Sequence, residues 1–116
     1  MNVAILRGRL SSPPRTQELA SGDRLVSLDV TTRAATGPAE SVPVAWFTAP
    51  DPVPGWEAGQ ELVVVGRVRR RFFRTGGGTA SRTEVVATAV LPASRRAAAA
   101  KALDAALVEA RQVVAG

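Results

Sequence analysis

Two strand-like stretches on either side of three consecutive glycines constrain the fold of this chain more than any other feature. Gln60–Arg74 and Thr79–Leu91 are rich in valine and other residues that favour strands, and Gly76–Gly78 lies between them. A short glycine-rich connection between two such stretches is typical of antiparallel strands, so the pattern predicts a long β-hairpin. Pro92 ends the second strand, because proline donates no ladder hydrogen bond.

Three further strands are predicted before this hairpin. Val3–Leu10 combines β-branched and aliphatic residues, and Val26–Thr31 alternates apolar with polar residues at a period of two. Ser41–Thr48 is the third, in which Pro43 favours an edge or a bulge. Arg15–Leu19 is interpreted as a short continuation of the first strand after a bend. Five short strands with turn signals between them predict an all-β protein built on a small barrel.

The C-terminal part of the chain has a helical pattern. Ser94–Val114 is alanine-rich and holds neither proline nor glycine, which predicts one α-helix with Ser94 as its N-cap. Apolar side chains share one face of this helix: Ala99, Leu103, Ala106, Leu107, Ala110 and Val114. The pattern leaves open whether this face packs on the chain's own barrel or on a second copy. We expect a barrel domain over residues 1–92 and a helical segment over residues 93–116.

The positive charge of the chain is concentrated in the predicted hairpin. Six arginines and no acidic residue lie between Glu61 and Glu84, whereas the rest of the chain holds nine basic and ten acidic residues. The whole net charge of +5 therefore comes from one segment, as expected of a surface that binds a polyanion. A charged edge strand that resists aggregation is the alternative interpretation.

The residue types that are missing narrow the possible chemistry. The chain has no cysteine and no histidine, which excludes thiolate and imidazole catalysis and the usual zinc ligand sets. Its carboxylates show no acid/base pairing, and the glycine triplet lacks the lysine and hydroxyl residue of a P-loop. We therefore expect a protein that is not an enzyme and needs no metal or cofactor. Without a signal-like or membrane-spanning stretch, a cytoplasmic location is expected.

Side chains of the first hairpin strand divide into two sets, because successive residues of a strand point to opposite faces. The even-numbered positions 62–68 are apolar or glycine and are predicted to face the barrel interior. Arg67, Arg69, Arg71 and Phe73 share the other face. Guanidinium groups pair with phosphates, and an aromatic ring offers a platform on which a base can stack. The set predicts contact with a nucleic acid whose bases are unstacked; a core position is the alternative for Phe73.

These residues and their order resemble the bacterial single-stranded DNA-binding protein family. The resemblance covers about residues 1–91 and rests on an ordered set of short matches: Asn2 with Ile5-Leu6-x-Gly8-Arg9-Leu10, Pro14-Arg15-Thr16, Ser21-Gly22, Val42-Pro43-Val44-Ala45-Trp46, Gly66-Arg67-Val68-x-x-Arg71-x-Phe73 and Thr83-Glu84-Val85-Val86. It implies a five-stranded OB-fold that binds single-stranded DNA without sequence preference, in DNA replication, repair or recombination. It also implies a homo-oligomer, with a tetramer favoured over a dimer.

The resemblance further implies which residues contact the nucleic acid. Phe73 matches a stacking aromatic, and Trp46 and Phe47 both fall near a second stacking position. The sequence does not decide which of these two stacks, and the other is expected to point inward. The full candidate set joins these three aromatics to eight arginines: Arg9, Arg15, Arg33, Trp46, Phe47, Arg67, Arg69, Arg71, Phe73, Arg74 and Arg82.

The chain departs from the family pattern in three respects. Two further aromatic positions hold other residues, Ser41 or Val42 at one of them, which lowers the expected affinity. Trp56 lies in a proline-rich loop and is predicted to pack that loop down. The end ARQVVAG lacks the acidic, phenylalanine-tipped tail, so no recruitment of replication proteins through such a tail is expected, as in a tailless paralogue. The alternative function is a primosomal-type protein-interaction module with weak or no DNA binding, and the sequence does not distinguish DNA from RNA.

Overall fold

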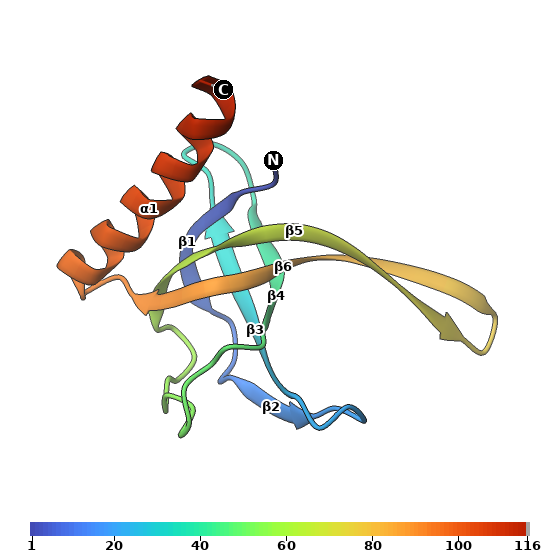
Figure 1. The fold of residues 1–116 in the computed structure, drawn as a ribbon. Coiled ribbons are helices and arrows are strands. Elements are labelled where there is room, and N and C mark those ends of the chain that lie inside the picture. Colours follow the sequence, from blue (N-terminus) through green and yellow to red (C-terminus); the bar gives the residue numbers. More distant parts are fainter. Residues whose placement is uncertain (116) are drawn as a thin grey trace.

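Five strands close into a mixed β-barrel in the computed structural model, which describes residues 1–115 (Figure 1). The predicted fold class is confirmed: the described chain is mostly β, with one extra strand and one C-terminal helix. Its elements follow in chain order: β1 (Ala4–Leu10), β2 (Arg15–Glu18), β3 (Arg24–Arg33), β4 (Ala39–Trp46), β5 (Glu61–Thr75), β6 (Gly78–Pro92) and α1 (Arg96–Ala115). Gly116, the end of the expected helical segment, lies outside the described residues.

The sheet runs in the order β1-β5-β6-β4-β3-β2, and pairing of β1 with β3 closes the barrel. All neighbours are antiparallel except β4 and β6, which run parallel through the pairs Val44 with Val85 and Ala45 with Val86. Arg15–Glu18 form β2, which continues β1 along the same edge of β3: Leu10 of β1 pairs with Val30, and Arg15 of β2 pairs with Ser27. The interpretation of Arg15–Leu19 as a short continuation of the first strand after a bend agrees with this register. The two prolines before Arg15 interrupt the ladder between β1 and β2.

The core lies inside the barrel and follows the period-two pattern. Val26, Leu28 and Val30 of β3 are fully buried, and Leu62 and Val64 of β5 meet them from the opposite wall. Because alternate residues fill the interior, the intervening side chains of the same strands point outward. The alternation of the sequence therefore fixes which residues are available on the outer surface.

Strands β5 and β6 continue past the barrel as a projecting hairpin (Figure 1). We call its outer part, residues 68–84, the arm. The pairing of β5 with β1 ends at Gly66, beyond which β5 continues with β6 alone. A Cβ at this position would overlap the carbonyl oxygen of Val86, so only glycine allows the close approach of β6. A bulge follows at the same level of β6, where the Thr88 hydroxyl donates a hydrogen bond to the Val65 carbonyl (3.1 Å). The bulge allows the hairpin to bend away from the barrel.

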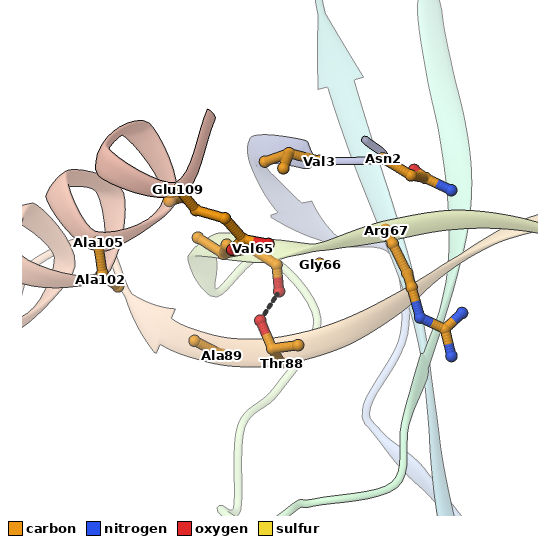
Figure 2. Close-up of a pocket in the computed structure, with 11 residues that line it drawn as sticks. Asn2, Val3, Val65, Gly66, Arg67, Thr88, Ala89, Ala102, Ala105 and Glu109 are labelled. Atoms are coloured by element: carbon orange, nitrogen blue, oxygen red, sulfur yellow. Dashed lines mark hydrogen bonds between the residues drawn. The ribbon is translucent and has the colours of Figure 1, made fainter. Parts of the chain in front are cut away.

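The helix α1 packs on the chain's own barrel, which answers the question that the sequence left open. Ala99 and Ala106 are buried, and Figure 2 shows the helix beside β5 and β6, with a pocket between them. Leu107 and Val114 of the predicted stripe are exposed instead, because the small alanines bring the helix close to the strands on one side only. Among residues 1–115, no helix is long and apolar enough to cross a membrane.

The predicted N-cap of this helix is displaced by one residue. The first intrahelical hydrogen bond runs from the Ala99 N–H to the Arg95 carbonyl (2.9 Å), so Arg95 is the N-cap in place of Ser94. The Arg95 N–H in turn donates to the Pro92 carbonyl (3.0 Å). Ser94 is therefore held within a turn that precedes the helix.

Candidate nucleic-acid interface

A groove on the outer face of the barrel gathers side chains from strands far apart in the sequence. We call it the outer groove. It receives outward-facing residues of β3, the end of β4 and the base of the arm, and Arg15 of β2 adds a further cation. Its principal lining residues are Arg15, Leu25, Ser27, Pro43, Ala45, Phe47, Arg69, Arg71, Arg82 and Glu84. Six of the eleven candidate binding residues therefore lie in or beside one surface once Phe73, which adjoins Arg71, is included.

Trp46 and Phe47 have opposite environments, because β4 alternates as it ends. Trp46 is only 5% exposed and stacks on Trp56, with ring centroids 5.8 Å apart. This contact holds the proline-rich loop against the barrel, as predicted for Trp56. Phe47 points outward into the outer groove, where the Arg69 guanidinium lies 5.5 Å from its ring centroid. Of these two candidates, Phe47 is thus the one available for stacking, and Trp46 belongs to the core.

Phe73 lies on the arm and not in the core. Its side chain is 39% exposed, and the Arg71 guanidinium lies 5.5 Å from the centroid of its ring. Arg69 and Arg71 are two residues apart on one face of β5, so the pairs Arg69–Phe47 and Arg71–Phe73 follow one another along the same surface. The result is an alternation of flat guanidinium groups and rings beginning at the barrel and continuing onto the arm.

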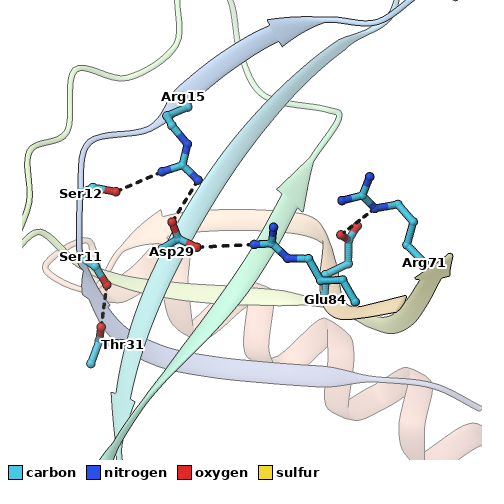
Figure 3. Close-up of polar contacts among 8 residues, drawn as sticks. Ser11, Ser12, Arg15, Asp29, Thr31, Arg71 and Glu84 are labelled. Carbon is cyan, nitrogen blue, oxygen red and sulfur yellow. Dashed lines mark hydrogen bonds and ion pairs between the residues drawn. The ribbon is translucent and has the colours of Figure 1, made fainter. Parts of the chain in front are cut away.

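Two carboxylates orient four of the arginines, and Figure 3 shows Asp29 with Arg15 and Glu84 with Arg71. Glu84, which is 5% exposed, accepts from Arg69 Nη2 at 2.7 Å and from Arg71 Nε at 3.3 Å. Asp29 Oδ2 lies 3.0 Å from Arg15 Nη2, and Asp29 Oδ1 lies 3.9 Å from Arg82 Nη2. Each guanidinium has five N–H donors, so these contacts leave donors that can bind a phosphate. Within this network the arginines outnumber the carboxylates, and the groove stays positive.

The two carboxylates are members of the groove network that the sequence pattern did not indicate. Glu84 stands directly across the ladder from Arg69, and Asp29 lies on β3, distant in sequence from Arg82. Only the strand register brings these charges together. One local feature did point to Glu84: it is a single acidic residue directly before the apolar run of β6. An acidic residue in such a place is buried only when it has charged or hydrogen-bonding partners.

The remaining candidates lie outside the outer groove. Arg67 and Arg74 are exposed, and neither has a carboxylate oxygen within 4.0 Å in the described part of the chain. Arg9 and Arg33 line a different surface near Glu61, so the structure does not bring them together with the groove residues. Six of the eleven candidates therefore belong to the outer groove and its edge and two to the surface near Glu61. Of the other three, Trp46 is in the core, and Arg67 and Arg74 lie on other exposed parts of β5.

Glu61 on that second surface is held by Arg7 and Arg9. The hydrogen bond from Arg7, followed by the positive charge of the same guanidinium, lowers the pKa of the Glu61 carboxyl from its ordinary value. Because the pKa is lowered in the folded state, this pair stabilises the fold at neutral pH. The contribution is lost as the pH falls through the lowered pKa.

Comparison with known proteins places the fold. No family model matches the chain, and no curated protein matches its sequence. Within residues 1–115, no three acidic side chains come together as a metal site. Among solved structures, the chain is similar to that of a Plasmodium falciparum SSB in complex with ssDNA, with a TM-score of 0.63 and 18% sequence identity over 74% of this chain and 85% of that one. This likeness shows that the chain has an OB-fold-like barrel.

Proposed function

We propose that this protein binds single-stranded DNA without sequence preference through the outer groove and the adjoining face of the arm. The observation that carries the proposal is the pair of rings, Phe47 and Phe73, each beside an arginine guanidinium at 5.5 Å. An exposed ring next to a cation offers a base a stacking surface and its phosphate a counter-charge. The protein acts by binding and not by catalysis.

The chemistry of the groove favours single strands over duplexes. Stacking requires bases that are free of their neighbours, and every base has a π-face, so rings bind any sequence. The similar solved structure is itself a complex with ssDNA, which supports this choice of ligand. In a duplex the bases are already stacked, and only the phosphates would remain accessible to the arginines.

Arg67→Ala is expected to weaken the salt dependence of binding. Arg67 is exposed and lies on the same face of β5 as Arg69, so it is free to neutralise a phosphate. Losing one phosphate contact reduces the slope of log K against log salt by about 0.7 for a single strand. Fluorescence titrations with oligo(dT) over a range of salt measure the slope, with duplex DNA of equal length titrated in parallel.

Arg111→Ala is the matched control, because Arg111 is an exposed arginine on α1, away from the outer groove. Its slope should equal that of the unmodified protein. Equal slopes for Arg67→Ala and the unmodified protein would remove Arg67 from the interface. Failure of the unmodified protein to bind oligo(dT) at low salt would overturn the proposed function. Titration with oligo(U) tests RNA as the ligand.

A protein-interaction module is the second candidate, and one observation favours it. Arg69 and Arg71 share the carboxylate of Glu84, which satisfies part of their hydrogen-bonding capacity within the chain. A module of this kind would bind a protein partner with no effect of Arg69→Glu, and it would not bind oligo(dT). Co-purification followed by the same titrations separates the two functions.

We also propose that the protein forms a homo-oligomer, a tetramer in preference to a dimer. Over Ala4–Gly8, β1 pairs with β5 on one edge, and no strand among residues 1–115 pairs with its other edge. An open edge with an exposed Ile5 can pair with a second copy. Assembly would also join several small binding surfaces and raise avidity. Light scattering should give a mass about four times 12.1 kDa; the mass of a single chain would contradict assembly.

A further inference from the structure

The arm has a second face whose chemistry repeats that of the first. Even-numbered residues of β5 point away from the side that carries Arg71 and Phe73: Val68, Arg70, Phe72 and Arg74. The last three of these residues have small hydroxyl residues as direct partners on β6: Thr83 opposite Arg70, Ser81 opposite Phe72 and Thr79 opposite Arg74. We call this surface the reverse face of the arm. It again combines arginines with a phenylalanine.

The reverse face is more exposed than the face that adjoins the outer groove. The Phe72 side chain is 67% exposed, against 39% for Phe73. Neither Arg70 nor Arg74 has a carboxylate oxygen within 4.0 Å among residues 1–115, whereas Arg69 and Arg71 share Glu84. The two reverse-face guanidinium groups are therefore free to bind an anion, and the ring between them is uncovered.

Only the tip separates the two faces at the outer end of the arm. The strands end in the pair Thr75 with Gly78, and Gly76 and Gly77 form the turn between them. Because both turn residues are glycine, the tip carries no side chain. A Cβ added at either of them would have no other atom within 4 Å, so the tip is surrounded by open space. A polynucleotide chain can pass closely across it from one face to the other.

We propose that the reverse face is a second contact surface for the same single-stranded DNA, which continues from the outer groove around the tip of the arm. This inference rests on the proposed function. The positive charge of the reverse face favours a nucleic acid over a second copy of the chain as its ligand. Arg70 and Arg74 attract phosphates, and they would repel the equally basic arm of a second copy. Phe72 lies between them and serves as a platform for one base.

The test compares Phe72→Ala with Phe73→Ala on two lengths of labelled oligo(dT), one of about 8 nucleotides and one several times longer, because one OB-fold covers about 4–16 nucleotides. Phe72→Ala should weaken binding of the long oligonucleotide by about 5- to 150-fold and leave the short one unchanged. Phe73→Ala should weaken both. Because Phe72 lies outside the core, the Phe72→Ala variant should have the same circular dichroism spectrum and thermal unfolding as the unmodified protein.

Three results would overturn the inference in different ways. Unchanged binding of the long oligonucleotide by Phe72→Ala, with loss in Phe73→Ala, would reject the reverse face and keep the proposed function. Unchanged binding by both variants would reject the reverse face and Phe73 together. A lower mass of Phe72→Ala in light scattering, with unchanged DNA affinity, would assign the reverse face to contact between copies.

Discussion

Replacing both Phe47 and Phe73 with alanine should weaken oligo(dT) binding by about 2–6 kcal/mol. Under the proposed function each ring stacks on one base, and each such contact contributes about 1–3 kcal/mol. The two rings lie at successive positions of the same surface, each beside its own arginine, and neither belongs to the buried core cluster. The slope of affinity against salt should stay nearly constant, since no phosphate contact is removed. Fluorescence titrations at several salt concentrations measure both quantities.

The matched control keeps the rings. Phe47→Tyr with Phe73→Tyr preserves two aromatic faces and should bind within a few-fold of the unmodified protein. Circular dichroism should show that the alanine pair remains folded. If the alanine pair binds as tightly as the tyrosine pair, the rings do not stack on bases. A lower salt slope in the alanine pair would instead mean that the rings act by positioning Arg69 and Arg71.

Trp46→Ala should lower the free energy of unfolding by about 3–5 kcal/mol, although Trp46 is the immediate neighbour of Phe47. The Trp46 ring is buried and stacks on Trp56 at 5.8 Å, so its removal leaves a cavity in the core and releases the proline-rich loop. Small domains are stable by about 5–15 kcal/mol, and the loss is therefore a large share of the total. Urea unfolding followed by circular dichroism measures it.

Phe47→Ala is the natural comparison for this variant. It changes an aromatic residue one position away, but on the outer face of the barrel, and should cost far less stability. Trp56→Ala should reproduce part of the loss, because it removes the other half of the stack. Equal stabilities for Trp46→Ala and Phe47→Ala would contradict the inward orientation of Trp46.

The parts of this fold that could be predicted from sequence are those determined by local alternation. Val26, Leu28 and Val30 alternate with polar residues in the sequence and are buried in the structure, and the glycines at 76–78 lie at the hairpin tip as expected. Strand pairing over long separations could not be predicted. The position of Glu84 opposite Arg69 depends on the register of β5 with β6, and the bulge shifts that register between Val65 and Gly66.

Two further differences have the same physical origin. The interior or exterior position of Trp46 depends on where β4 meets β3 and β6, and Pro43 obscured the local period. The side of α1 that is buried depends on how closely its alanines approach β5, which the helical period alone does not specify. In each instance the chain pattern was compatible with two arrangements, and contacts between distant segments selected one.

The position of α1 limits how much of the outward side of β5 is exposed. Outward-facing Val63 and Val65 of β5 lie beneath the helix, and Arg67 is the next residue on that side of the strand. If the proposed DNA contacts Arg67, it has to leave this side of β5 there, because α1 covers the two valines that precede Arg67. The footprint of one protein molecule can then lengthen only across the outer groove or over the arm, and never along β5 toward its first residues.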